Sequence, residues 1–270
     1  MSAVIVIVLM LAVGFFNGAN DVSKSIATLV GSGVTRYRSA ILWGGLWTFA
    51  GAATAAFAAQ GLVAAFSGKG LMAATPAGYG FVLAVAIGAL AWIWLATATG
   101  LPVSTTHAIM GGLIGAGIVA VGFGNIHWVF LLDKFALPLA ASPLMSLALI
   151  FAVFPLVRAG LARWQGYCLC VQQPAAICCE NGDGAMTLTA SDSLVLDRTE
   201  ACVQSPVTVA GVTVADALHW LSAGATAFAR GLNDTPKILG LGLVASIALG
   251  LPSTGAFLFV AAAMAAGSVI

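Results

Sequence analysis

Long apolar stretches without a charged side chain make up most of this sequence, and they set its fold class. Of its 270 residues, 61% are hydrophobic and 7% are charged, and the mean hydropathy is +1.06. Stretches of this length and hydropathy are typical of segments that lie in a lipid bilayer. Helices satisfy their backbone hydrogen bonds within one segment. We therefore predict an all-α polytopic membrane protein.

At about 20 residues per crossing, the apolar segments lie near 2–17, 39–60, 80–97, 104–122, 135–157, 211–229, 237–250 and 254–270. Several are short for a full crossing, and 32 glycines and 9 prolines interrupt them. Membrane helices tolerate such breaks where protein or a water-filled cavity satisfies the freed backbone groups. We expect broken helices. The first residues lack a basic region and a cleavage site, which predicts a membrane segment and not a removed signal peptide.

One extended polar region divides the chain into two halves. Residues 158–210 form this region, which we interpret as a cytoplasmic loop between a first transmembrane repeat, 1–157, and the start of a second, 211–270. Basic residues of short loops prefer the cytoplasm. They occur as two pairs separated by four predicted crossings, which places both on the same side: Arg36 with Arg38, and Arg158 with Arg163.

The polar region also holds all five cysteines: Cys168, Cys170, Cys178, Cys179 and Cys202. Their spacing lacks the paired C-x-x-C arrangement of a zinc site. A reducing cytoplasm disfavours disulfides. We therefore predict reduced, passive thiols without a metal or redox role.

Two short segments share the same pattern of polar and charged residues. Five residues recur at an offset of 213 positions: Phe15, Gly18, Asn20, Asp21 and Lys24 match Phe228, Gly231, Asn233, Asp234 and Lys237. Charges beside apolar runs are costly and usually mark a transport path. The glycines let the backbone leave helical geometry, and unwound backbone with a carboxylate can bind Na⁺ or receive a proton. The alternative is that each Asp and Lys, three residues apart, only neutralise each other.

A second polar cluster stands between the repeats, in residues 100–107, GLPVSTTH. We expect Pro102 to end the preceding helix and Ser104 or Thr105 to cap the next one. Hydroxyls and free N–H groups at a helix N-terminus favour an anion such as phosphate. The alternative is a plain cap whose hydroxyls bond back to the helix. His107 is more typical of a satisfied polar residue than of a ligand.

These motifs, GANDVSKSIATLVGSG, then GLPVSTTH, then a second G-x-N-D, together resemble the inorganic phosphate transporter family, whose permeases couple phosphate to Na⁺ or H⁺. The resemblance implies an inverted-repeat secondary transporter, multi-pass in the plasma (inner) membrane. It also implies the site residues: Asn20, Asp21, Asn233 and Asp234 for the cation, and Ser104, Thr105 and Thr106 for phosphate.

The chain departs from the family pattern in two ways. Many members carry Asn or another small residue where this chain has Lys24 and Lys237, so we expect these ammonium groups to attract the anion or to replace one coupling cation. The family also has a second P-V-S-T-T-H hairpin, whereas this chain ends 36 residues past Asp234. The segment 251–255, LPSTG, is expected to be a helix-breaking turn. The second half therefore looks incomplete.

We thus expect inward transport of inorganic phosphate with Na⁺ or H⁺ and no other cofactor. Sulfate is the alternative substrate, and a truncated or partner-dependent subunit is the alternative role. A membrane enzyme with Ser104 or Thr105 as nucleophile and His107 as base lacks a G-x-S-x-G motif. A net charge of +1 argues against nucleic acid as a partner. Symmetry makes a homodimer one expected assembly.

Overall fold

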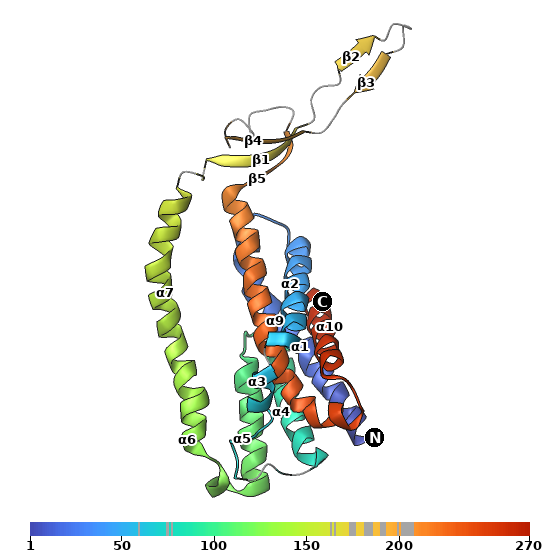
Figure 1. Ribbon diagram of the computed structural model, residues 1–270, viewed down its shortest axis with the longest axis vertical. Coiled ribbons are helices and arrows are strands. Elements are labelled where there is room, and N and C mark those ends of the chain that lie inside the picture. Colours follow the sequence, from blue (N-terminus) through green and yellow to red (C-terminus); the bar gives the residue numbers. More distant parts are fainter. Residues whose placement is uncertain are drawn as a thin grey trace. The chain divides into compact units, whose positions relative to one another are not determined.

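The computed structural model describes residues 1–58, 60–73, 78–162 and 208–270, together with 76, 164, 166–172, 177–180, 186–189, 193–198 and 200. These residues form two compact units (Figure 1). The first unit, the helical unit, comprises Met1–Ala140 and Ser222–Ile270, and the second comprises Ala141–Leu221. The division at 157/158 and 210/211 stays a prediction, because these units follow packing and not sequence repeats.

The helical unit contains most of the helices of the chain. Their bounds are α1 Ser2–Gly31, α2 Tyr37–Ala58, α3 Gln60–Ala65, α4 Tyr79–Thr99, α5 Thr105–Val121, η1 Phe123–Asn125, α6 Trp128–Leu131, η2 Leu132–Ala136 and α10 Ser253–Val269. Helix α7, Leu137–Leu161, begins in this unit, and α9, Val214–Ala248, ends in it. Among the residues that the structure describes, four stretches are long and apolar enough to cross a membrane: 2–31, 37–58, 79–99 and 128–161. The chain is an all-α polytopic membrane protein, as predicted.

The two helices that carry the repeated motifs run through them without a break. Helix α1 continues to Gly31, and α9 joins the predicted segments 211–229 and 237–250 into one helix of 35 residues. The predicted unwinding at Gly18 and Gly231 is therefore wrong. A Cβ atom on Gly18 would lie 1.9 Å from the carbonyl oxygen of Met264. These glycines serve close helix packing, because a hydrogen in place of a side chain lets two backbones touch.

Residues from the two ends of the chain pack together at such contacts. Helix α10 lies against α1 and α2 (Figure 1). A Cβ on Gly267 of α10 would lie 1.8 Å from the carbonyl oxygen of Phe15, and one on Gly51 of α2 would lie 2.0 Å from that of Phe228. Helices α10 and α9 are thus held on α1 and α2, respectively, by direct backbone contact.

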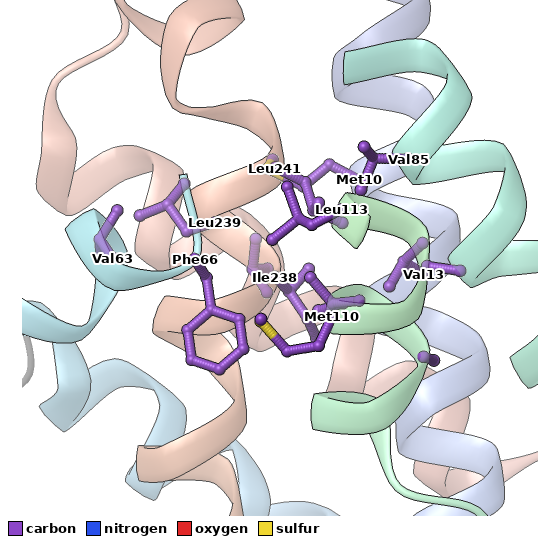
Figure 2. Packing of buried hydrophobic residues seen from close by; sticks show 14 of the residues in the cluster. Met10, Val13, Val63, Phe66, Val85, Met110, Leu113, Ile238, Leu239 and Leu241 are labelled. Carbon is purple, nitrogen blue, oxygen red and sulfur yellow. The ribbon is translucent and has the colours of Figure 1, made fainter. Parts of the chain in front are cut away.

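An apolar cluster joins the remaining helices of this unit. Figure 2 shows side chains of α1, α3, α4, α5 and α9 in contact, with Phe66 from the end of α3: Met10, Val13, Val63, Val85, Met110, Leu113, Ile238, Leu239 and Leu241. Ile238 follows directly after the second motif, and Met110 lies in the first turns of α5. The cluster therefore fixes the second motif beside the start of α5.

Glycines end two of the apolar helices. Helix α4 ends at Thr99, where Gly100 has the left-handed φ of 71° and the N–H of Leu101 donates to Ala96 O at 2.9 Å. The helix thus ends before Pro102, and the prediction that Pro102 stops it is wrong, because the glycine already closes the last turn. Helix α9 ends at Ala248, with Gly250 at φ 65°, before α10 begins at Ser253. The break between the two helices thus lies at residues 249–252, and residues 253–255 of the predicted turn already belong to α10.

The second unit contains the strands, which the sequence reading missed. They are β1 Tyr167–Gln172, β2 Ile177–Glu180, β3 Met186–Thr189, β4 Ser193–Arg198 and β5 Thr208–Thr213. Strands β4, β1 and β5 form an antiparallel sheet in that order, and β2 pairs with β3. Short half-exposed strands give a weak alternation signal, which the polar composition of the predicted loop obscured.

Two of the five cysteines are paired within this sheet. Cys168 and Cys170 are buried on one face of β1, and their sulfur atoms lie 2.7 Å apart. Residues two apart on a strand share a face, which brings the two sulfur atoms together, and the predicted reduced, passive state of the thiols stays a prediction. Cys178 and Cys179 lie in β2, and Cys202 and Arg163 lie outside the described residues.

An added methyl group should destabilise the protein at a glycine in close backbone contact, but not at a glycine without neighbours. We expect Gly18→Ala to lower the free energy of unfolding by about 1–3 kcal/mol, because α1 and α10 must separate. The matched control is Gly88→Ala on α4, which has no neighbouring atom within 4 Å of the added Cβ and should be neutral or stabilising. The measurement is the thermal midpoint of each purified variant in detergent. Equal midpoints would contradict the packing role of Gly18.

Candidate functional site

The first repeated motif forms hydrogen bonds with the hairpin segment. We define the hairpin segment as residues 100–107, which comprise the link after α4 and the first turn of α5. The Nδ2 group of Asn20 donates to Leu101 O at 2.8 Å, and Val103 N donates to Asn20 Oδ1 at 3.1 Å. Asn20 is buried on α1. Both polar ends of its side chain are thus used to fix the hairpin backbone, a role that the sequence reading did not assign to it.

The charged pair of the first motif also reaches the hairpin segment. Lys24 Nζ donates to Asp21 Oδ1, one helical turn earlier. The same Nζ donates to Val103 O at 2.5 Å. Asp21 is buried, whereas Lys24 is exposed over about a third of its side chain, 35%. The ammonium group therefore bridges α1 and the hairpin.

The second motif repeats this geometry from α9. Lys237 Nζ donates to Asp234 Oδ1 at 3.0 Å and to Thr106 Oγ1 at 2.8 Å. It also lies 5.9 Å from the centroid of the Phe66 ring, within reach of a cation–π interaction. Both Asp234 and Lys237 are buried. Two motifs 213 residues apart thus place matching Asp–Lys pairs on one hairpin.

A third cation, Arg230, lies beside the first pair and was missed by the sequence reading. Its Nε is 4.0 Å from Asp21 Oδ2, and its Nη2 donates to Thr48 Oγ1 at 3.0 Å. Within the part of the chain that the structure describes, its Nε and Nη1 are buried without a hydrogen-bond partner. An arginine inside an apolar run is costly, so the sequence already carried a signal for it.

The repeat offset pairs Arg230 with Asn17, which is also at the site. Asn17 Oδ1 accepts a hydrogen bond from Thr105 Oγ1, and both residues are buried. Among the described groups, Asn17 Nδ2 has no partner. Asn17 and Arg230 occupy matching positions of the two motifs. Among the described residues, each has buried side-chain N–H groups without a hydrogen-bond partner near the hairpin segment.

The three hydroxyls of the hairpin have separate partners. Ser104 is the N-cap of α5, and its Oγ accepts from His107 N at 3.4 Å. Thr105 donates to Asn17, and Thr106 accepts from Lys237. The backbone N–H groups of Thr105 and Thr106 lie in the first turn of α5, so they have no acceptor within the helix. With the exposed Ser104 hydroxyl, they remain as donors for an anion.

The structure brings together most of the site residues that the sequence predicted. Around the hairpin lie Asn20, Asp21, Lys24, Thr105, Thr106, Asp234 and Lys237. Asn233 differs from its match Asn20, because Asn233 is exposed. Ser104 is the N-cap of α5, as the sequence predicted for Ser104 or Thr105. Asn233 is therefore the predicted residue whose surroundings differ most from the expectation.

The fixed charges of this region do not cancel. Three basic side chains, those of Lys24, Arg230 and Lys237, face the two carboxylates of Asp21 and Asp234. The formal sum is one positive charge beside the free N–H groups of a helix N-terminus. Such a site favours an anion, because both the charge and the orphan donors attract negative groups.

Residues 17–270 match the sequence profile of PHO4, the phosphate transporter family. Relatives include the phosphate-repressible phosphate permease of Neurospora crassa, 42% identical over 38% of this chain and 18% of that protein. A probable low-affinity inorganic phosphate transporter of Mycobacterium leprae is 30% identical over 64% of this chain and 38% of that protein. The chain thus matches less than half the length of these relatives.

A solved structure shares the fold. The structure titled "The sodium-dependent phosphate transporter" matches all of this chain and 75% of its own, with a TM-score of 0.63 and 20% identity. At this identity the likeness concerns the fold alone.

Removal of the Asn20 side chain should loosen the hairpin segment. In Asn20→Ala, Leu101 O and Val103 N lose their partner, which costs about 1–3 kcal/mol of local stability. We expect the backbone amide of Val103 to exchange with solvent about tenfold faster or more. Hydrogen–deuterium exchange with mass spectrometry measures this change.

Ser23→Ala is the control for this prediction, because the Ser23 hydroxyl bonds within α1, to Asn20 O at 3.1 Å, and to no hairpin atom among the described residues. Exchange in the hairpin should not change in that variant. Unchanged exchange in Asn20→Ala as well would show that Asn20 does not hold the hairpin.

Proposed function

The chain belongs to the phosphate transporter family, and we propose that it carries inorganic phosphate across the membrane with Na⁺ or H⁺ as the coupling ion. One observation carries the proposal: the Asp–Lys pairs of both repeats converge on one hairpin. Charged groups at membrane depth are costly unless they serve a path or a partner. A convergent, net positive cluster beside free amides is suited to phosphate.

Phosphate would bind at the first turn of α5. The N–H groups of Thr105 and Thr106 and the hydroxyl of Ser104 would donate to its oxygens, as at other helix N-termini that bind phosphate. Lys24 and Lys237 would add positive charge from the two sides. The same donors suit sulfate, so sulfate is the competing substrate of the same site.

The coupling cation would bind at the two carboxylates. Asp21 and Asp234 are buried near the hairpin, where a bound Na⁺ or a proton would change the charge that phosphate meets. Asn20 would support this site by holding the hairpin and not by binding the ion, since its amide already bonds to Leu101 and Val103.

Transport is favoured over catalysis by the geometry around His107. Its ring lines an apolar cavity with Met110, Leu131 and Phe135. Among the described residues, no side-chain hydrogen bond joins this ring to Ser104 or Thr105, whereas a nucleophile and its base should be within hydrogen-bond reach. We therefore propose a carrier and not an enzyme.

The direct test is uptake of radiolabelled phosphate into proteoliposomes that contain this protein, with an imposed cation gradient. We expect uptake that unlabelled phosphate abolishes and that equal sulfate reduces little. Stronger inhibition by sulfate would assign the site to sulfate. Well-folded protein without uptake would contradict the proposal for the chain on its own and favour a role that needs a partner or a second copy.

Substitution of Ser104 separates anion binding from capping. Asp is a good N-cap, so Ser104→Asp should retain the thermal midpoint of the protein. Its negative charge should raise the half-saturating phosphate concentration by tenfold or more, which corresponds to about 1.4 kcal/mol. Ser104→Thr retains both the hydroxyl and the cap and is the control. Normal uptake by Ser104→Asp would limit Ser104 to capping.

A further inference from the structure

We propose that Lys24 and Lys237 are tethered cations that occupy the places of a mobile coupling ion at Asp21 and Asp234, so that Na⁺ neither binds at these carboxylates nor drives transport. The inference rests on the proposed function and concerns its coupling ion. Of the two coupling ions proposed above, Na⁺ and H⁺, only H⁺ then remains.

Each ammonium lies where a small cation would be coordinated. Lys237 Nζ is 3.0 Å from Asp234 Oδ1 and 2.8 Å from Thr106 Oγ1. The oxygens around it are a carboxylate of the motif and a hydroxyl of the hairpin, both of which are ligands that small hard cations prefer. An ammonium only donates, so it satisfies these oxygens as a metal ion would.

The first motif forms the same arrangement with different atoms. Lys24 Nζ bridges Asp21 Oδ1 and Val103 O. Again one oxygen comes from the motif and the other from the hairpin. Simple neutralisation within one helical turn would explain the Asp–Lys contacts, but it does not explain why both ammonium groups also bond to the hairpin.

The charge balance also disfavours an additional cation. Arg230 lies 4.0 Å from the second oxygen of Asp21. Both carboxylates therefore already face fixed positive charge, with one positive charge in excess. A Na⁺ added here would raise the uncompensated charge to two in a poorly solvated region, where unpaired charge is costly. An anion, by contrast, would lower it.

An ammonium group that is part of the chain cannot couple transport to an ion gradient. Coupling requires that the ion binds on one side of the membrane and leaves on the other. Lys24 and Lys237 are part of the chain and stay with it. The two ammonium groups thus supply the positive charge that phosphate needs without the release of an ion, and transport becomes independent of Na⁺.

The test compares Na⁺ with K⁺ on the purified protein and on two lysine variants. In the unaltered protein, exchange of K⁺ for Na⁺ at constant ionic strength should leave the thermal midpoint unchanged. In Lys237→Ala, the freed Asp234 and Thr106 oxygens should bind Na⁺, so Na⁺ should raise the midpoint by several degrees over K⁺. Lys24→Ala, at the more exposed pair, provides a second variant if Lys237→Ala does not fold.

Lys69→Ala is the charge control, because Lys69 is exposed and distant in sequence from both motifs; it should show no Na⁺ response. Direct binding of radioactive Na⁺ checks the same variants. Na⁺ binding by the unaltered protein, or no Na⁺ response in either folded lysine variant, would overturn the inference.

Phosphate uptake by the unaltered protein completes the test, with Na⁺ replaced by K⁺ at a clamped membrane potential. Equal uptake supports the inference, and uptake that falls tenfold without Na⁺ overturns it. A complete lack of uptake would contradict the proposed function instead, whereas the binding measurements on Na⁺ would still decide the role of the lysines.

Discussion

The site depends on the compensation of buried charge. Asp21 and Asp234 lie inside an apolar helical unit, where an unpaired carboxylate would cost several kcal/mol. Each is paired with a lysine one turn later on its own helix, and each lysine continues to the hairpin. The same bonds therefore stabilise the carboxylates, position the hairpin and leave positive charge beside the first turn of α5.

Close helix packing makes these bonds possible. Gly18 and Gly231, one turn or less before the aspartates, let α1 approach α10 and α9 approach α2 until backbone atoms touch. A larger residue at Gly18 would separate α1 from α10, and one at Gly231 would separate α9 from α2. The motif thus combines two requirements in one helical stretch: a glycine for the approach of the helices, and an Asp–Lys pair for the hairpin.

The sequence predicted the membrane class and most helix positions, and it singled out the two motifs and residues 100–107, because apolar length and repeated charge are local signals. The contacts of both motifs with residues 100–107 come from the fold. The sequence did not predict the continuity of α1 and α9, since glycine is compatible both with unwinding and with close packing, and only the neighbouring helix decides. It also did not predict the roles of Arg230 and Asn17. Their partners, Thr48 and Thr105, come from other helices and leave no trace in local spacing.

In the proposed function, the hairpin segment and the two lysines form one anion site. Arsenate has the shape and charge of phosphate and scatters X-rays anomalously, so a crystal structure of the protein with arsenate would locate the anion directly. We expect one anomalous peak within hydrogen-bond distance of the Thr106 amide and close to Lys24 Nζ and Lys237 Nζ. A peak elsewhere in the helical unit, with none at the first turn of α5, would contradict this expectation.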